Sequence, residues 1–478
     1  MERGKDMLYI KDLRDGDTIR TIYLCKGKRS AETRNGKPYD NLILQDKTGT
    51  LDGKVWDPNS QGICDYSEKD FIEVFGDVIT YKDVYKRQQS AYQDNLNAIS
   101  PQAYSNVDGL ELEPGTYISI IGKETDTAYW KAVAKGVEQA VTDLNEHLGY
   151  TGNDKIKVTY NAPEAGEDID EQVNILDEEL SRYPDVIAIA SIDADEGTVQ
   201  FDQATENGIP IVAFDSGNDY QGIVSTCKTD NQEAARTGAS KLCDEIGDAG
   251  QILVLAKNSH SASAKERLSG IEKEIAQHDQ VEIAEVLYYD QIQDMKKSMA
   301  AERTLELPEG SPEITVDKIT DGEVLNEYLA QHPDVKGILG TNSDVTEWAL
   351  ETLQANAVEN KAQEKKSEVK NSKTVQDAQE EAGVPEEPKE EDQENVQKRT
   401  TDDIALVGFD AEKKELEALK SGEIKGLVVQ NPFGMGYATV VAAARTVLEL
   451  GNEAKVDTGY IWVTKENMDS DSIKNMLY

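Results

Sequence analysis

From Gly115 onward, short apolar runs alternate with segments whose apolar residues recur at helical spacing. The run "TYISIIG" at 116–122 precedes a helical pattern at 128–148, and this pair of elements recurs along the chain. Strands that alternate with helices form βαβ units, in which helices cover both faces of a parallel sheet. The alternation restarts after residue 229. We therefore predict an α/β fold with two doubly wound parallel-sheet lobes.

The predicted elements form two halves of similar size. In the first lobe, further strands are expected at 155–161, 186–191 and 210–216, with helices at 169–183 and 197–208. In the second lobe, strands are expected at 251–257, 281–289, 335–342 and 404–410, with helices at 233–246 and 263–277.

The residues that follow the predicted strands are rich in polar and aromatic side chains. They read "GKETDTAYW", "FDSGN", "KNSHS", "LGTNSD" and "GFDAE". In doubly wound sheets, ligands bind beyond the carboxyl ends of the strands. Carboxylates and amides can pair with sugar hydroxyls, and an aromatic ring can cover the apolar face of a sugar. These strand ends predict a site for a polyhydroxylated small molecule.

Sequence motifs of catalysis are absent. The chain has no P-loop, no GxGxxG after the first strand and no Ser/His/Asp nucleophile pattern. The dipeptide His278-Asp279 lacks the further residues of a two-metal phosphohydrolase site. The cysteines show no zinc or disulfide spacing, so we expect free thiols at Cys25, Cys64, Cys227 and Cys243. We predict no catalytic residues, no metal and no cofactor.

Residues from about 114 to 470 resemble the ribose-type periplasmic (type 1) sugar-binding proteins, the solute receptors of ABC importers. The resemblance rests on stretches in the same order, among them "AYWKAVAKGVEQA", "NGIPIVAFDSG", "TDNQEAARTGASKL", "DVKGILGTNSD" and "VDTGYIWVTKENMD". In that family two α/β lobes joined by a hinge of three crossing strands close on a sugar. The resemblance implies a receptor, not an enzyme, that delivers a monosaccharide-like ligand to an ABC permease.

The resemblance also implies which residues bind the ligand. Carried over by motif position, they are Thr127, Tyr129, Trp130, Asp215, Arg267, Asn342, Asp410 and Gln430. Two further candidates are Ser216, where the family often has Arg, and His260, near the ligand histidine of glucose/galactose-type relatives. The chain is expected to cross between the lobes near 226–230, 430–432 and 459–461.

These crossings set the expected domain limits. Lobe 1 comprises 114–228 and 431–459, and lobe 2 comprises 229–430 and 460–478. Two insertions depart from the family. Residues 301–325 lengthen one loop. Residues 357–400 are charged and free of aromatics, so we predict a disordered surface excursion.

Residues 1–82 have a different character. Short β-rich runs at 18–25 and 39–46 flank the hairpin signal Asn35-Gly36, which favours a small all-β barrel. The stretch resembles the N-terminal OB-fold module of a bacterial 3′-5′ exoribonuclease family, here truncated and without its catalytic domain. That resemblance implies binding of single-stranded nucleic acid. The candidate side chains are Lys26, Lys28, Arg29, Arg34, Lys37, Tyr39 and Trp56.

The hexapeptide "DVYKRQ" at 83–88 stands between the two parts, within an expected junction and tether at 83–113. It is identical to the translation of a transposon end used to prepare sequencing libraries. We therefore interpret the chain as a chimera of two gene fragments joined at Asp83–Gln88.

The net charge of −42 disfavours nucleic acid as a partner of the whole chain. No apolar run reaches the roughly 20 residues of a membrane span, and the N-terminus resembles no signal peptide. We expect an extracytoplasmic receptor part, periplasmic or lipid-anchored, whose signal is missing here, and a cytoplasmic location if the chain is expressed as written. Two alternatives are a single-stranded RNA-binding module and the ligand sensor of a transcription regulator. The regulator would need a helix-turn-helix that 89–113 is too short to hold.

Overall fold

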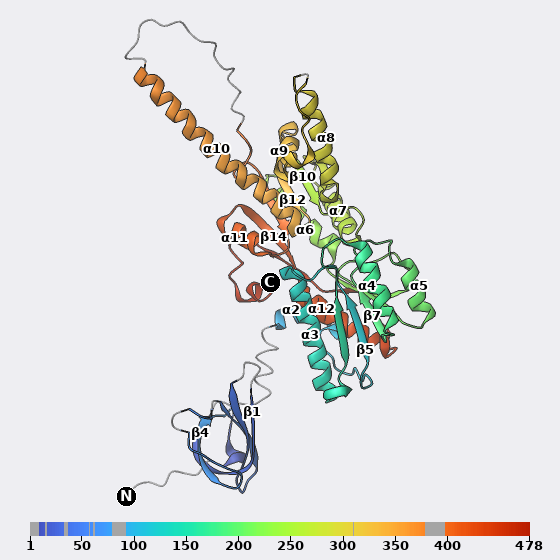
Figure 1. Ribbon diagram of the computed structural model, residues 1–478, viewed down its shortest axis with the longest axis vertical. Coiled ribbons are helices and arrows are strands. Elements are labelled where there is room, and N and C mark those ends of the chain that lie inside the picture. Colours follow the sequence, from blue (N-terminus) through green and yellow to red (C-terminus); the bar gives the residue numbers. More distant parts are fainter. Residues whose placement is uncertain are drawn as a thin grey trace. The chain divides into compact units, whose positions relative to one another are not determined.

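The computed structural model describes residues 9–14, 17–32, 37–56, 58–60, 63–78, 92–308, 310–377 and 397–478. The chain divides into two compact units, Met1–Ala91 and Tyr92–Tyr478, which Figure 1 draws from blue to red along the sequence. The predicted junction at 83–88 and the Asn35-Gly36 turn lie outside the described residues.

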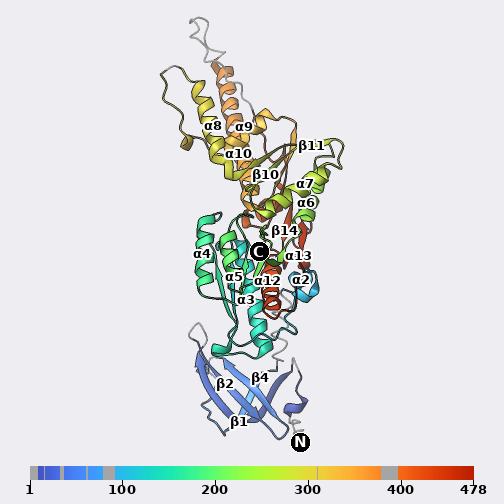
Figure 2. The same ribbon diagram turned by 90° about the vertical axis from the view of Figure 1, so that its right-hand side faces the viewer.

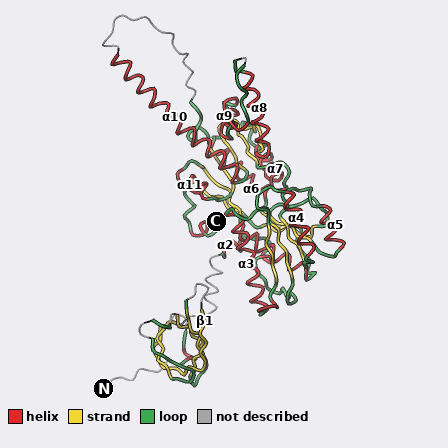
Figure 3. Tube along the Cα trace, in the orientation of Figure 1, coloured by secondary structure: helices red, strands yellow, loops and turns green. Residues whose placement is uncertain are grey.

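The first unit is an antiparallel sheet with strand order β3-β2-β1-β4. Its strands are β1 (Thr18–Glu32), β2 (Pro38–Gln45), β3 (Thr50–Trp56) and β4 (Phe71–Asp77). The long β1 pairs with β4 through its first half and with β2 through its second half, so the sheet curls on itself (Figure 3). Alternate side chains point inward and form a small core of Ile19, Tyr23, Cys25, Leu42 and Leu44. The small OB-like all-β module is confirmed.

Lobe 1 of the second unit is built on a six-stranded sheet of order β15-β9-β8-β7-β5-β6, in which all neighbours are parallel. Its strands are β5 (Tyr117–Ile121), β6 (Lys157–Asn161), β7 (Val186–Ile189), β8 (Ile211–Phe214), β9 (Ile223–Lys228) and β15 (Lys455–Asp457). Two helices pack on each face. They are α3 (Ala128–Leu148) with α12 (Pro432–Val447), and α4 (Ile169–Ser181) with α5 (Thr198–Glu206).

Lobe 2 repeats this plan with the order β11-β10-β12-β13-β14-β16, where only β16 is antiparallel to its neighbour. Its strands are β10 (Gly250–Ala256), β11 (Val281–Tyr288), β12 (Val335–Gly340), β13 (Ala405–Phe409), β14 (Ile424–Gln430) and β16 (Tyr460–Val463). One face carries α6 (Asn231–Glu245) and α7 (Ala262–Ile275). The other carries α8 (Ile292–Leu305), α9 (Asp321–Gln331), α10 (Ser343–Asp377) and α11 (Lys413–Ser421). The predicted α/β fold class is confirmed.

The chain passes between the lobes at three places. Figure 2 shows the two lobes, one with α3, α4 and α5 and the other with α8, α9 and α10. It leaves β9 for α6 after Lys228, leaves β14 for α12 after Gln430, and runs from β15 to β16 between Asp457 and Tyr460. The C-terminal segment with α13 (Asp471–Lys474) follows, and Tyr478 packs against the apolar cores of both lobes.

Lobe 1 depends on a close crossing of α3 and α12. A Cβ added at Gly136 would lie 2.0 Å from the carbonyl oxygen of Phe433, and one at Gly436 would lie 2.1 Å from that of Val133. Only glycine lets the two helix backbones approach this closely. The crossing anchors α3, whose N-terminus carries several of the predicted ligand residues.

The segment 92–113 corrects the expectation of a tether. It forms α2 (Gln93–Asn97) and a 3-10 turn at Gln102–Tyr104, and its apolar residues are buried in the core of lobe 1. The ring of Tyr92 stacks on Phe433 with centroids 3.9 Å apart. The tether prediction is therefore wrong from Tyr92 onward, because the apolar residues of this segment pack into the core of lobe 1. The described part of the segment holds no helix-turn-helix.

The two insertions are more helical than expected. Helix α8 includes residues 301–305, and α10 continues to Asp377, so the disorder predicted for 357–400 is wrong over 357–377. That stretch is rich in Ala, Glu, Lys and Gln, which have high helix propensity. The side chain of Asn360 also fixes the helix by donating to the carbonyl oxygen of Lys398 at 2.6 Å. No helix of the described residues is long and apolar enough to cross a membrane.

Candidate ligand-binding site

A pocket lies between the lobes, at the carboxyl ends of strands from both sheets. Its empty volume is about 670 Å³, including the part open to solvent. The structure brings all of the main predicted ligand residues to this one pocket: Thr127, Tyr129, Trp130, Asp215, Arg267, Asn342, Asp410 and Gln430.

Asp215 is the lobe 1 carboxylate of the pocket, directly after β8. It is 8% exposed and accepts a hydrogen bond from the hydroxyl of Tyr129 at 2.6 Å. Its second oxygen lies 3.2 Å from the Lys123 ammonium. Burial, and next the Asp215 charge, raise the pKa of Tyr129, so the phenol remains a donor. Both carboxylate oxygens therefore have a donor, and a ligand hydroxyl can use their remaining lone pairs.

Asp410 holds the corresponding place in lobe 2, directly after β13. It accepts from the amide of Gln430 at 2.7 Å and from the hydroxyl of Tyr478 at 3.2 Å. The amide oxygen of Gln430 in turn accepts from Thr229 at 3.0 Å. Gln430 and Thr229 lie where the chain crosses between the lobes. The hinge is thus connected to the pocket by hydrogen bonds.

The two aspartates have equivalent backbone settings. The φ angle is 57° at Asp215 and 76° at Asp410, in the left-handed region that non-glycine residues seldom adopt. The amide of Asp215 donates to Cys227 in β9, and that of Asp410 donates to Val428 in β14, both at 2.9 Å. In each lobe, the strand that follows the aspartate in the chain therefore holds the turn at that aspartate by a backbone hydrogen bond. Strained turns of this kind often occur at functional sites.

Arg267 on α7 is 6% exposed and held on several sides. It donates to Asn231 at 2.9 Å and to the carbonyl oxygen of Thr341 at 2.6 Å, and its guanidinium lies 4.6 Å from the ring centre of Phe409. Next to Thr341, the buried side-chain oxygen of Asn342 has no hydrogen-bond partner within the described structure. That oxygen can accept from a bound hydroxyl.

The aromatic wall comes from the start of α3. Thr127 caps this helix, since its hydroxyl accepts from the amide of Trp130 at 3.3 Å. The cap sets the direction of the next residues. The rings of Tyr129 and Trp130 meet edge to face with centroids 5.3 Å apart, and Trp130 also meets Phe214 at 6.2 Å.

The sequence reasoning missed a charged cluster at one end of the pocket. Lys257 lies 2.8 Å from Asp344 of its own lobe and 3.5 Å from Glu167 of lobe 1. Burial alone would lower the pKa of Lys257, but these carboxylates outweigh burial and raise it. Glu124 faces the cluster, and burial raises its pKa. Lys257 directly follows β10, so the strand-end rule could have found it, whereas Glu167 belongs to a loop without a motif.

The two further candidates do not line the pocket. The hydroxyl of Ser216 accepts from the amide of Ser263 in lobe 2 at 3.3 Å. The His260 ring lies 3.4 Å from Asp193 and 3.9 Å from Glu167, both of lobe 1. The structure thus places Ser216 and His260 in contacts between the lobes.

In the first unit, the nucleic-acid candidates separate into two groups. Lys28 donates to the carbonyl oxygen of Tyr66 at 3.1 Å and pairs with the buried Asp40, so its ammonium is engaged within the fold. The rings of Tyr39 and Trp56 lie 5.3 Å apart, with Trp56 62% exposed. Lys26, Arg29 and Lys37 are exposed, and Arg34 lies outside the described residues.

Comparison with known proteins relates the two units to different families. The family model for periplasmic binding protein domains matches residues 118–382. A carbohydrate transporter solute binding protein from Agrobacterium radiobacter, in complex with D-arabinose, aligns with a TM-score of 0.56 and 22% identity over 76% of this chain and 99% of that chain. An ABC transporter solute binding protein from Agrobacterium vitis with bound D-fucose aligns with a TM-score of 0.54 and 22% identity, over 76% and 100% of the two chains. These structures share the fold.

The N-terminal region is similar to a 3'-5' exoribonuclease, YhaM. The protein from Listeria welshimeri serovar 6b is 29% identical over 92 residues, which are 18% of this chain and 29% of that protein. The protein from Bacillus subtilis is 31% identical over 100 residues, which are 21% and 31% of the two chains. The chain thus spans less than a third of the length of these curated relatives.

Proposed function

The chain belongs to the periplasmic binding protein family, and from this premise we propose that residues 92–478 form a non-enzymatic receptor for a monosaccharide-sized sugar. The observation that carries the proposal is the pair of equivalent aspartates, Asp215 and Asp410, directed into one pocket from the two lobes. A ligand that bonds to both carboxylates interacts with both lobes at once. It therefore favours the closed state over the open state.

The charges of the pocket favour a neutral ligand. Lys123, Lys257 and Arg267 line it, but each already has an oxygen partner within the protein. The unpartnered oxygen of Asn342 instead needs a donor. A polyhydroxylated ligand supplies such donors, whereas a sugar acid or sugar phosphate would add charge beside Asp215 and Asp410. The sugars in the structural neighbours, D-arabinose, D-fucose and α-D-tagatopyranose, are neutral monosaccharides of this kind.

Contacts between the lobes support closure as the working motion. The carboxylate of Glu412 in lobe 2 accepts from the amide of Ala128 at 2.9 Å, at the N-terminus of α3 in lobe 1. The positive end of the helix dipole favours this carboxylate. Asn258 of lobe 2 donates to Glu167 of lobe 1 at 2.7 Å. We place the receptor outside the cytoplasmic membrane, with the permease of an ABC importer as the partner of its closed state.

The proposal is tested by melting the full chain with a panel of neutral pentoses and hexoses and the matching uronic acids. A true ligand raises the melting temperature by mass action, roughly in proportion to the logarithm of its concentration. We expect a shift with at least one neutral sugar and a smaller shift with its uronic acid. The absence of a shift with every neutral sugar would remove the proposed function.

A second candidate function concerns the first unit alone. The ammonium of Lys54 lies 5.5 Å from the ring of Trp56, beside the Tyr39–Trp56 pair, and exposed aromatic rings with a cation can stack single-stranded bases. We propose that this cluster binds short single-stranded RNA. Fluorescence anisotropy of a labelled oligonucleotide with the full chain should show binding that Trp56→Ala weakens and high salt abolishes. Equal binding by Trp56→Ala would contradict it.

The two units match unrelated families, which supports the proposal that 83–88 joins two gene fragments. Long-read sequencing of the source DNA tests this directly. A single uninterrupted gene across codons 70 to 110 would overturn it, while separate genomic positions for the two parts would establish it.

A further inference from the structure

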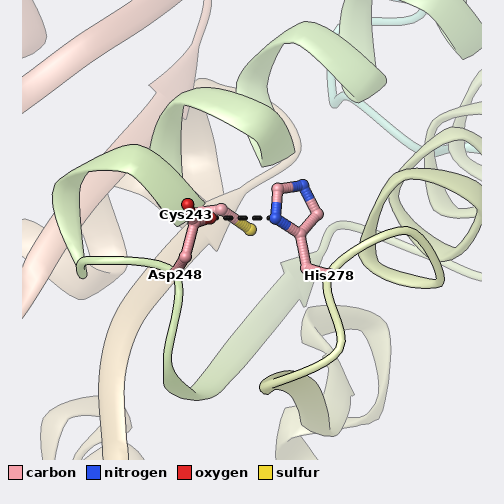
Figure 4. Close-up of side chains that lie close together, drawn as sticks. All are labelled: Cys243, Asp248 and His278. Carbon is pink, nitrogen blue, oxygen red and sulfur yellow. Dashed lines mark hydrogen bonds and ion pairs between the residues drawn. The ribbon is translucent and has the colours of Figure 1, made fainter.

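Three side chains of the types that bind metal ions lie close together in lobe 2, away from the pocket. Cys243 is on the last turn of α6, Asp248 is in the turn that leads to β10, and His278 is in the loop between α7 and β11 (Figure 4). One ligand atom from each residue, the cysteine sulfur, a carboxylate oxygen and a ring nitrogen, lies within 4.8 Å of the others. Both β10 and β11 begin beside this group, so it lies at the opposite end of the sheet from the sugar pocket.

The backbone brings these side chains together. The turn after α6 folds back so that the amide of Asp248 donates to the carbonyl oxygen of Cys243 at 2.8 Å. The amide of His278 donates to the carbonyl oxygen of Ile275 at the end of α7, which turns the imidazole toward the same place. Figure 4 shows the sulfur, the carboxylate and the ring converging. Two helix ends, not one flexible loop, therefore position the group.

The contacts of His278 match those of a metal-binding histidine. Its Nδ1 lies 2.9 Å from the Asp248 carboxylate, and its Nε2 faces Glu274 at 3.6 Å. The Nδ1 contact is a hydrogen bond to Asp248, and a cation bound between the two groups would replace it. The carboxylate of Glu274 then favours the imidazole proton on Nε2, as in many zinc sites. Arg236 holds Glu274 in place at 3.1 Å.

The sulfur atom of Cys243 indicates which metal ions fit the site. It is a free, fully buried cysteine, and the structure records no hydrogen bond of its thiol within the described residues. Sulfur with imidazole and one carboxylate favours a zinc-like ion, whereas Ca²⁺ and Mg²⁺ select sites made of oxygen. The Asp248 side chain is 62% exposed, which leaves an open side for a water ligand.

We propose that Cys243, Asp248 and His278 bind one Zn²⁺ ion, with water as the fourth ligand. Donor atoms at about 2.0–2.3 Å from the ion require side-chain shifts of the order of 1 Å from the present arrangement. Binding breaks the S–H bond of Cys243, forms a sulfur–metal bond and releases the proton to solvent. The ion would link the C-terminal end of α6 to the loop that precedes the edge strand β11. This site is independent of the proposed sugar binding.

Titration of the reduced full chain with Co²⁺, followed by near-ultraviolet and visible absorption, tests this site. One equivalent should produce a thiolate-to-cobalt charge-transfer band and the visible bands of a tetrahedral ion, and Zn²⁺ should remove both. Cys243→Ser should abolish the charge-transfer band. Cys227→Ser is the matched control, because Cys227 is also free and buried, and it should leave the band unchanged.

Two further variants keep the test decisive if Cys243→Ser does not fold. Asp248→Asn and His278→Gln should each weaken Co²⁺ binding at least tenfold while circular dichroism stays native. The proposal is overturned if the native chain gives no thiolate–cobalt band at excess Co²⁺. It is also overturned if the band persists in a folded Cys243→Ser or if His278→Gln binds Co²⁺ as tightly as the native chain.

Discussion

The rings of Tyr129 and Tyr478 meet edge to face with centroids 5.8 Å apart, and each hydroxyl donates to a different aspartate of the pocket. Tyr129 bonds to Asp215 at 2.6 Å and Tyr478 bonds to Asp410 at 3.2 Å. One aromatic contact thus links the carboxylates of the two lobes. The C-terminal residue of this chain takes part in positioning the site.

Tyr129→Phe tests this link. The substitution keeps the ring and removes the only hydroxyl that bonds to Asp215 within the described residues. A hydrogen bond to a carboxylate contributes about 1.5–3 kcal/mol, so we expect sugar affinity to fall roughly tenfold or more. Tyr183→Phe, at a residue 73% exposed, is the control and should bind normally in calorimetry. Unchanged affinity of Tyr129→Phe would show that Asp215 needs no such support.

Lys257→Met tests the charged cluster between the lobes. Without the ammonium, Glu167 of lobe 1 faces Asp344 of lobe 2 with no cation between them. We expect the open state to gain population and sugar affinity to fall on the order of tenfold. Small-angle scattering should report a larger radius of gyration. Lys297→Met, which removes an exposed pair with Asp294 on α8, should change neither quantity.

Gly136→Ala tests the crossing of α3 and α12. The new methyl group would lie 2.0 Å from the carbonyl oxygen of Phe433, so the helices must separate. Overpacking of this kind costs about 1–3 kcal/mol or more, and the melting temperature should fall by several degrees. The control is Gly322→Ala near the start of α9, where the nearest atom is Thr352 Oγ1 at 3.4 Å. It should be neutral or slightly stabilising.

Glu415→Gln tests a buried carboxyl of lobe 2. Burial, and next the charge of Asp410, raise the pKa of Glu415 well above its usual value, and one of its oxygens has no partner within the described structure. A raised folded pKa gives stability at low pH that is lost as pH rises through that value. The variant should therefore be more stable than the native chain at pH 8, by on the order of 1 kcal/mol. At pH 5 the difference should shrink. An equal difference at both pH values would contradict the assignment.

The sequence could place a side chain at the pocket where that side chain directly follows a buried strand. Asp215 and Asp410 are such residues, because an apolar run ending in a polar residue marks both the strand and its functional end. The sequence did not predict Glu167 and Glu412, because their positions depend on how the loops of one lobe contact the other lobe. Tyr478 was not predicted either, because its hydrogen-bond partner Asp410 is distant in the sequence.

Two further segments, 92–113 and 357–377, are folded although their sequence patterns do not predict it. The composition of 357–377 predicts disorder. The segment is nevertheless helical, because its residues have high helix propensity and Asn360 donates a hydrogen bond to Lys398. The run 92–113 lacks a regular period, so its burial in lobe 1 could not be inferred. It depends on partners such as Phe433, far along the chain.

Isothermal titration calorimetry of the full chain, with the sugar that gives the largest melting shift, tests whether one ligand bonds to both aspartates of the pocket. We expect binding of one sugar per chain, loss of the heat signal in Asp215→Asn and in Asp410→Asn, and native binding by Asp219→Asn, an exposed position near the first aspartate. Native affinity in both folded pocket variants would show that the sugar binds elsewhere.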